Sequence, residues 1–362
     1  MPITETSLWK ADFLLVLFVG ILISSSTKGI SQPLIPPLIP GIMVFGDSIV
    51  TVGNNNNLRT LVKSNFPPYG RDFINQHPSG RFCNGKIALD FTCENLGLTK
   101  YPPEILSKEA KGKNLLLGAN FASGGSGYYE STARLYNTIS LRKQLEYYKE
   151  YQMKLVDVAG PSNATSLIRG SIYIVSAGAS DFVQNYYVNP LLNKFYKPHQ
   201  FSGILIKAYS HFIQELYRLG ARKIGVSNIP PIGCLPASIT IFGKDKNECV
   251  TKMNLVAQYF NKKLNATSIN LKAMLPGLKL VVLDIYEPLY NMIHKPSDFG
   301  FFEARKACCG TGLVETSFLC NKKSPGTCAN ATEYVFWDGF HPSEAANKIL
   351  AEELLIDGIS LL

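Results

Sequence analysis

Three side chains near the two ends of the sequence have the types and spacing that nucleophilic catalysis needs. An apolar run at 42–45 passes directly into the Gly-Asp-Ser sequence at 46–48, so Ser48 is expected on a tight turn between a strand and a helix. Asp338 lies three residues before His341, in a loop that enters the last predicted helix. A carboxylate at this spacing accepts the imidazole Nδ1–H and leaves Nε2 to take a proton from a serine hydroxyl.

A glycine-rich stretch at 120–127, Asn-Phe-Ala-Ser-Gly-Gly-Ser-Gly, follows another apolar run. It lacks the Lys-Ser/Thr pair of a phosphate-binding loop and the glycine spacing of a dinucleotide site. We expect its backbone amides to point at a developing oxyanion instead. Each motif alone also fits a plain structural role, a capped turn for Ser48 and a helix-entry residue for His341.

The elements that must position these residues follow from the apolar pattern. Short apolar runs are predicted to be buried parallel strands at 42–45, 115–121, 172–176, 223–227 and 278–285. Segments such as 140–154 and 201–219 carry apolar residues every three or four positions and are predicted helices. Alternating strands and helices indicate an α/β protein with a parallel sheet covered on both faces. The reactive loops then lie at the carboxyl ends of strands, where such sheets form their sites.

The composition limits the class of protein. Of the 362 residues, 46% are hydrophobic and 17% are charged, which excludes a disordered chain. The net charge is 36 − 27 = +9, but the basic residues are scattered, so nucleic-acid binding is not expected. An anionic surface, such as an acidic polysaccharide or a membrane, is compatible with this charge.

The N-terminus predicts export. Lys10, the apolar run 13–23 and three serines are typical of a secretory signal peptide, assigned to residues 1–28. The run is short for a membrane span, and no later segment approaches that length without charges, so no transmembrane segment is expected after its removal. An uncleaved anchor is the alternative. A Pro-rich lead-in at 29–40 is expected to be extended, and residues 41–362 are predicted to form a single domain.

All eight cysteines lie beyond the signal segment, so up to four disulfides are expected in an oxidising compartment. The last four, between Cys308 and Cys328, are expected to staple a loop just before the 338–341 motif. Their spacing does not give the paired CxxC or CxxH of a zinc site, so no metal is expected. Glycosylation sequons at Asn163, Asn265 and Asn330 agree with an exported glycoprotein.

Taken together, the segments 45–50, 53–56, 120–125 and 336–344 resemble the plant-type GDSL esterase/lipase family, a branch of the SGNH hydrolases. The resemblance spans nearly the whole mature chain and is supported by shorter segments at 68–71, 80–82, 185–187, 230–234 and 308–310. It implies a three-layer α/β/α sandwich with a flavodoxin-like parallel sheet, the SGNH hydrolase fold. It also implies a carboxylic-ester hydrolase that needs no cofactor.

On this resemblance, Ser48 matches the nucleophile, and Asp338 and His341 complete a Ser-His-Asp triad that works through an acyl-enzyme. The implied oxyanion donors are the amide of Ser48, the amide of Gly125 (or of the adjacent Gly124) and the side chain of Ser180. Ser180 stands where the family usually has an asparagine, so the third donor is expected to be weaker. Thr51 is a second departure, at a position where the family often has an aspartate.

The expected substrate is a small-molecule or lipid ester, and the expected location is outside the cell, in the wall or apoplast. Two alternatives remain open. The basic, secreted character also suits a deacetylase of acetylated cell-wall polysaccharide. The altered third donor also suits a weakly catalytic binding or structural protein.

Overall fold

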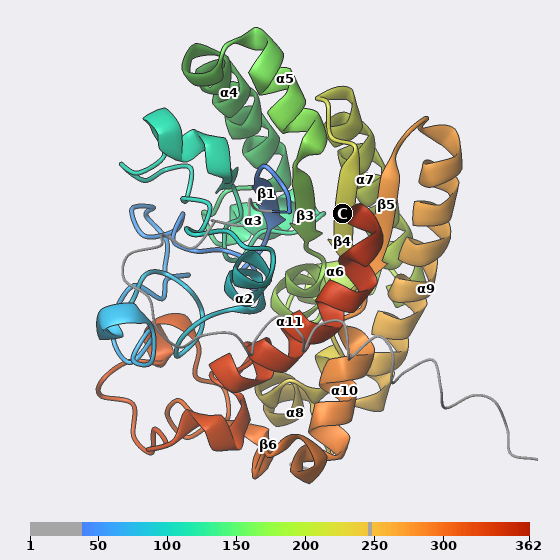
Figure 1. Cartoon of the computed structure of the whole chain (residues 1–362). Helices are drawn as coiled ribbons and strands as arrows, with labels where there is room; N and C mark the ends of the chain where they lie inside the picture. The colour runs from blue at the N-terminus through green and yellow to red at the C-terminus, as the bar shows by residue number, and fades with distance from the viewer. Residues whose placement is uncertain (1–37, 245–247) are drawn as a thin grey trace, which may run out of the picture. The chain divides into compact units, whose positions relative to one another are not determined.

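The computed structural model describes residues 38–244 and 248–362. The predicted signal peptide and most of the Pro-rich lead-in lie outside the described residues. In the described part, five parallel strands form a sheet in the order β2-β1-β3-β4-β5 (Figure 1). The strands are β1 (Ile42–Gly46), β2 (Gly118–Asn120), β3 (Ile172–Ser176), β4 (Lys223–Ser227) and β5 (Lys279–Leu283). This strand order is that of the flavodoxin-like doubly wound fold, as expected.

Helices connect the strands and cover both faces of the sheet. Because the side chains of a strand alternate between faces, Met43 and Phe45 pack into one core cluster and Ile42 and Val44 into another. Helices α4, α7 and α9 contribute to the first cluster, and α2 packs against the second. The helices are α2 (Ala88–Asn95), α3 (Glu130–Leu135), α4 (Leu141–Ala159), α5 (Pro161–Gly170), α6 (Pro190–Phe195), α7 (Pro198–Arg218), α8 (Pro236–Phe242), α9 (Thr251–Met274), α10 (Tyr286–His294) and α11 (Glu344–Gly358). The three-layer α/β/α architecture is therefore confirmed.

One predicted strand is shorter than its apolar run. Residues Gly112–Leu117 form a 3₁₀ helix, and only Gly118–Asn120 pair with β1. Gly118 has a φ of +94°, and a Cβ there would lie 1.9 Å from the carbonyl oxygen of Ile42. The chain therefore needs glycine to turn into the sheet at this point, and the leucines before it pack without joining the strand.

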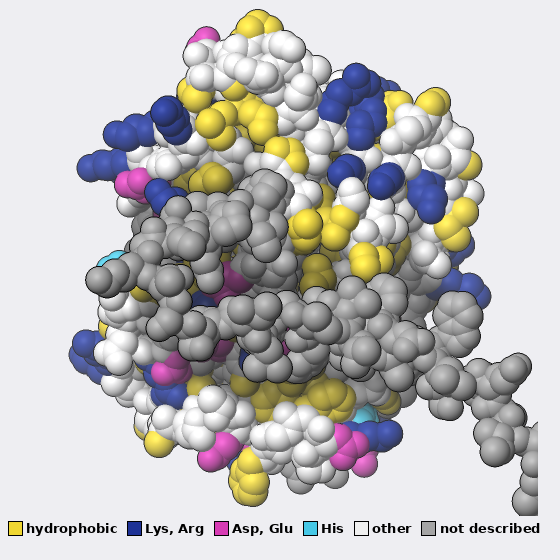
Figure 2. Space-filling view, viewed as in Figure 1, with side chains coloured by type: hydrophobic (Ala, Val, Ile, Leu, Met, Phe, Trp, Pro, Cys, Tyr) yellow, Lys and Arg dark blue, Asp and Glu magenta, His cyan; other side chains and the backbone are white. Residues whose placement is uncertain are grey.

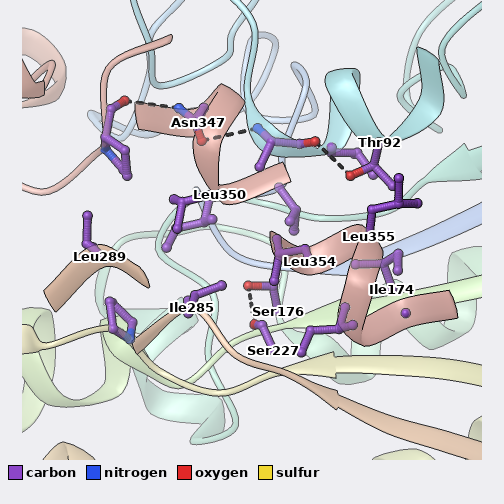
Figure 3. Close-up of a pocket in the computed structure, with 18 of the residues that line it drawn as sticks. Thr92, Ile174, Ser176, Ser227, Ile285, Leu289, Asn347, Leu350, Leu354 and Leu355 are labelled. Atoms are coloured by element: carbon purple, nitrogen blue, oxygen red, sulfur yellow. Dashed lines mark hydrogen bonds between the residues drawn. The ribbon is translucent and has the colours of Figure 1, made fainter. Parts of the chain in front are cut away.

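An apolar cavity of about 80 Å³ lies between α2, α11 and the sheet (Figure 3). Leu350, Leu354, Ile174 and Ile285 line it. Its hydroxyl groups are already bonded within the protein; Ser227, for example, donates to Ser176 at 2.7 Å.

Disulfides organise the segment before α11. The pairs Cys308–Cys328 and Cys309–Cys320 form, as the sequence predicts for the last four cysteines, and Cys234–Cys249 is a third pair. The possible fourth disulfide is absent among the described residues, because Cys83 and Cys93 are buried free thiols. The stapled segment adjoins a separate two-stranded ribbon of β6 (Glu303–Ala307) and β7 (Tyr334–Phe336), which leads into the 338–341 motif.

The described surface carries the basic excess in scattered groups. On the face shown in Figure 2, Lys and Arg side chains lie in separate groups with hydrophobic side chains between them. The sequon residues Asn163, Asn265 and Asn330 are all exposed. Within residues 38–244 and 248–362, no helix has the length and apolar character needed to cross a membrane.

Candidate active site

Ser48 lies on a turn immediately after β1. Gly46 has a φ of +139°, and a Cβ there would lie 1.9 Å from the carbonyl oxygen of Ser176 at the end of β3, so only glycine allows this close approach. The Gln144 side chain, from α4, accepts from the Gly46 N–H and donates to its carbonyl, both at 2.9 Å. The strand end that presents Ser48 is thus held from two sides. The expected helix after Ser48 is wrong, because the chain makes turns here and α2 begins only at Ala88.

His341 and Asp338 meet Ser48 from the other end of the sequence. Nε2 of His341 lies 2.8 Å from Oγ of Ser48, and Nδ1 lies 2.7 Å from Oδ1 of Asp338. All three side chains are buried, with Ser48 only 5% exposed. With Nδ1–H donating to Asp338, Nε2 accepts the serine hydroxyl, which is the arrangement that allows the imidazole to remove the serine proton. Helix α11 starts just behind this loop, where the Ser343 hydroxyl caps it by accepting from Ala346 N–H.

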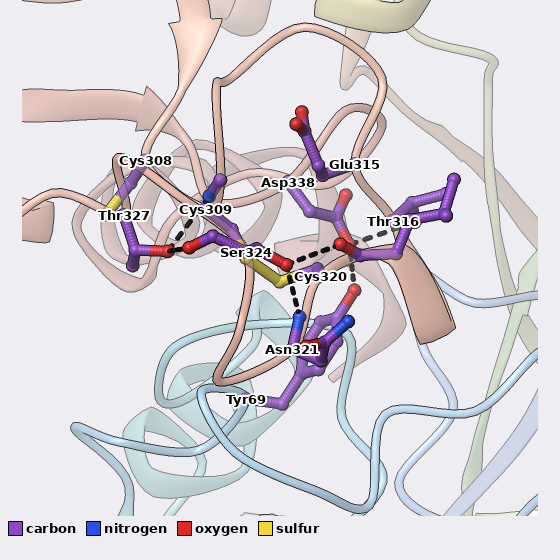
Figure 4. The surroundings of a disulfide bond; sticks show 12 residues. Tyr69, Cys308, Cys309, Glu315, Thr316, Cys320, Asn321, Ser324, Thr327 and Asp338 are labelled. Carbon is purple, nitrogen blue, oxygen red and sulfur yellow. Dashed lines mark hydrogen bonds between the residues drawn. A yellow bond between two sulfur atoms is a disulfide. The ribbon is translucent and has the colours of Figure 1, made fainter.

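Asp338 is held by donors from three separate segments. Its Oδ1 also accepts the backbone N–H groups of Phe340 and His341, both at 2.9 Å. Its Oδ2 accepts the hydroxyl groups of Tyr69 at 2.6 Å and Thr316 at 3.1 Å. Figure 4 shows Tyr69 and Thr316 meeting Asp338 beside the Cys309–Cys320 disulfide. The carboxylate therefore has a fixed orientation toward the imidazole.

Tyr69 is a site residue that sequence reasoning missed. Burial and the nearby Asp338 carboxylate raise the pKa of Tyr69 well above its ordinary value, so its hydroxyl stays a donor. The same oxygen accepts the Ser317 N–H at 2.8 Å, which links it to the stapled loop. Tyr69 lies in the 68–71 segment that supports the family resemblance, and this was the one sign of its importance in the sequence. The resemblance assigned no role to the tyrosine. Phe82, from another such segment, contacts the His341 ring in a tilted arrangement with centroids 4.9 Å apart.

The glycine-rich turn after β2 lies beside the end of β1. The Ser123 N–H donates to the Gly46 carbonyl at 3.0 Å. The Gly124 N–H is already bonded to Asn55 Oδ1, also at 3.0 Å. Among the described residues, the N–H groups of Ser48 and Gly125 have no protein acceptor. These two amides are therefore free to donate to a ligand, which favours Gly125 over Gly124 as the donor.

A network of amide side chains builds this turn. Asn55 accepts from Ser123 Oγ and Gly124 N–H, and it donates to the carbonyls of Val62 and Gly124. The neighbouring Asn54 bridges the carbonyls of residues 120 and 122. Thr51, the second departure from the family pattern, donates to the same Ala122 carbonyl at 2.9 Å. Its hydroxyl therefore belongs to the hydrogen-bond network that builds this turn.

Ser180 and two buried carboxyl groups form the third part of the site. The Ser180 side chain lies close enough to the buried Asp47 carboxyl group to act against the rise in its pKa. Burial raises the pKa of Asp47 to about 7, against the opposing effects of the Ile49 N–H bond and the His341 charge. Burial also raises the pKa of Asp181 to about 7, although it accepts bonds from Thr132, Tyr128 and Tyr129. Asp181 thereby anchors the start of α3.

A cavity of about 260 Å³ opens from Ser48 and His341. Its wall is mainly aliphatic and aromatic and includes Val62, Phe82, Val183, Phe242 and Phe340. Such a cavity suits a hydrocarbon group held next to the serine hydroxyl.

The chain matches known proteins in sequence over most of its length. The sequence profile of the GDSL-like Lipase/Acylhydrolase family matches residues 42–354. A GDSL esterase/lipase of Arabidopsis thaliana is 63% identical over 329 residues, covering 90% of this chain and 91% of the relative. The GDSL esterase/lipase APG of the same plant is 58% identical and covers 93% and 96%. A solved structure, LAE5, an alpha/beta hydrolase enzyme from the metagenome of Lake Arreo, Spain, aligns with a TM-score of 0.42 at 9% identity, covering 89% of this chain and 96% of that one.

The family match covers most of the chain, and the relatives match along nearly their whole length. The chain therefore belongs to the plant-type GDSL esterase/lipase family and is a serine ester hydrolase.

Proposed function

We propose that Ser48, His341 and Asp338 are the catalytic triad of this hydrolase. The observation that carries the proposal is the unbroken row of short hydrogen bonds from Ser48 to His341 (2.8 Å) and from His341 to Asp338 (2.7 Å). A nucleophile, a base and a group that orients the base at these distances are what acyl transfer requires.

The reaction runs in two steps. His341 Nε2 takes the Ser48 proton as Oγ attacks the ester carbonyl, and the imidazolium then protonates the departing alcohol. Water next attacks the acyl-enzyme, with its proton going to Nε2, and the carboxylic acid leaves as Ser48 regains a proton. Asp338 stabilises the imidazolium in both steps.

Two backbone amides, Ser48 N–H and Gly125 N–H, are proposed to hold the oxyanion. Both lack a protein acceptor within the described chain, and their loops are joined through the Ser123–Gly46 bond. Ser180 is the third donor, with a smaller effect because its hydroxyl is shorter than the asparagine amide usual in the family and rotates freely. Each preorganised donor of this kind contributes on the order of 3 kcal/mol to lowering the barrier.

The cavity favours esters with an apolar acyl chain over acetyl groups on a polysaccharide. Its wall is mostly hydrocarbon and it extends well beyond the volume that an acetyl group fills. We propose secretion to the cell wall or apoplast, with residues 1–28 as the signal peptide and 41–362 as one hydrolase domain. The three disulfides support an oxidising compartment.

A panel of p-nitrophenyl esters from acetate to decanoate, run beside an acetylated sugar, tests the triad and the acyl-chain preference. We expect turnover by the wild type, loss of turnover in Ser48→Ala, and kcat/KM rising from acetate to medium chains. A fluorophosphonate probe should label the wild type and not Ser48→Ala. Turnover by Ser48→Ala equal to the wild type would reject the triad, whereas a preference for acetyl-sugar substrates would reject the acyl-chain assignment.

A further inference from the structure

The mouth of the catalytic cavity is surrounded by exposed apolar side chains. Leu61, Val188, Ile241, Phe318 and Leu319 all line this cavity, and each is between 45% and 69% exposed. We call these five residues the rim. Large apolar side chains gathered on a surface, rather than scattered singly, mark an interaction site.

The rim comes from four separate segments, and three of them are bonded to one another. The hydroxyl oxygen of Ser317, next to Phe318, lies 2.6 Å from the carbonyl oxygen of Leu61 and 2.8 Å from that of Lys63, so its proton is shared between them. The Cys309–Cys320 disulfide closes the loop that carries Phe318 and Leu319. On the opposite side, α8 carries Ile241 and is joined to the stapled loop by the bond from Thr240 to the Leu313 carbonyl. A preorganised apolar surface loses little conformational entropy on docking.

Positive charges accompany the rim. Within four positions of its residues lie Arg59, Lys63, Lys244, Lys322 and Lys323, none of which makes an ion pair in the described structure. The one described acidic residue in the same span is Glu315, whose carboxylate accepts bonds from its own loop. Unpaired cations in the segments that carry an apolar patch fit a surface that is both apolar and anionic.

We propose that the rim docks the enzyme on an anionic lipid surface, so that the acyl chain of a substrate passes from the lipid into the cavity. Rim side chains enter the boundary between headgroups and acyl chains, while the flanking lysines and arginine contact the anionic headgroups. The proposal rests on the proposed function for the role of the cavity. Its test uses binding alone, so the two can fail separately.

The test uses the secreted protein carrying Ser48→Ala, so that vesicles are not hydrolysed. Flotation with vesicles of phosphatidylcholine alone, or mixed with phosphatidylglycerol, measures binding. We expect binding to be about tenfold tighter to the mixed vesicles and to weaken as salt is added. No binding to either vesicle, or equal binding to both, would overturn the proposal.

A matched pair of variants locates the surface. The rim variant combines Leu61→Ser, Ile241→Ser and Phe318→Ser; the control combines Leu255→Ser, Ile269→Ser and Phe302→Ser, which are also exposed but do not line the cavity. Binding should fall about tenfold or more in the rim variant and stay unchanged in the control. Each rim substitution is also made alone, and an unchanged melting temperature of each single variant shows that folding is intact. Equal binding by the rim and control variants would assign vesicle binding to another part of the chain and overturn the proposal.

A separate variant tests the contribution of the positive charges near the rim. Replacing Lys244, Lys322 and Lys323 with Gln should weaken binding to mixed vesicles and leave binding to neutral ones unchanged. An unchanged affinity for the mixed vesicles would contradict the role given to these lysines.

Discussion

The two halves of the candidate site are built on different kinds of structure. Ser48 and Gly125 follow strands of the central sheet, and buried amide side chains such as Asn55 and Gln144 hold their turns. Asp338 and His341 follow the small β6–β7 ribbon outside that sheet, and disulfides together with Tyr69 hold them. We call these the sheet half and the stapled half.

The difference shows what each half depends on. In the sheet half, the turns converge because β1 lies between β2 and β3, so the carboxyl ends of all three strands meet at one edge. In the stapled half, loops far apart in sequence bond to the acid that orients the base. Substitutions in the stapled half should therefore disturb the position of the catalytic base. Those in the sheet half should disturb the turns that carry the nucleophile and the oxyanion donors.

The largest effect is expected for Asp338→Asn. An amide in place of the carboxylate favours the wrong imidazole tautomer and no longer stabilises the imidazolium, so kcat should fall by about 10⁴, the size found for this change in a serine-protease triad. Steady-state kinetics on a soluble ester measures the loss, and an unchanged melting curve shows that the fold persists. A fall of less than about tenfold would contradict the role of Asp338.

Opening the staple should affect both stability and rate. Replacing Cys309 and Cys320 with serine should lower the free energy of unfolding by about 2–5 kcal/mol. It should also lower kcat, because the loop carrying Thr316 and Ser317 is no longer held against Asp338 and Tyr69. Denaturant unfolding and kinetics measure the two effects. If kcat stays at the wild-type value, the staple does not position the acid.

Asn55→Ala probes the sheet half. Its side chain makes four hydrogen bonds within the turn, and removing it leaves buried groups of Gly124 without partners, at a cost of about 1–3 kcal/mol in unfolding free energy. Since the same turn carries Gly125, kcat should also fall while KM changes little. Asn55→Asp, which keeps the acceptor, is the control and should retain more activity. Equal kcat in the wild type and Asn55→Ala would contradict the link between this turn and the oxyanion.

The pKa of Asp47 predicts a pH effect on stability. Since burial raises it to about 7 in the folded protein, the folded state keeps a proton that the unfolded state has released between about pH 4 and 7. The unfolding free energy should therefore fall as pH rises through this window, by up to about 1.4 kcal/mol per pH unit. Asp47→Asn removes this contribution, so its stability should depend less on pH. Parallel profiles for the two proteins, measured by urea unfolding, would contradict the shift.

Ser180 should give the smallest effect. Because a short, rotating hydroxyl is a weaker donor than a fixed amide, Ser180→Ala should lower kcat by only about threefold, well short of the hundredfold expected from losing a full oxyanion donor. Ser180→Asn should raise kcat, since an amide has a second N–H to offer the oxyanion. A hundredfold loss in Ser180→Ala would instead make Ser180 a full donor.

The sequence was most informative where local pattern and topology decide the outcome. It predicted five strands, the parallel sheet and a loop closed by the last four cysteines, although not their pairing, and the structure brings Ser48, Asp338 and His341 together. It did not predict Tyr69 or Thr316, because their contacts with Asp338 depend on how long loops fold over one another. The helix expected after Ser48 failed for a related reason: asparagine side chains bond the backbone there and favour turns.

The Cys309–Cys320 bond also bears on when the enzyme becomes active. A newly made chain in a reducing environment lacks this bond, so its acid would be poorly aligned and its esterase weak. Full hydrolytic capacity would therefore require surroundings that keep this bond oxidised.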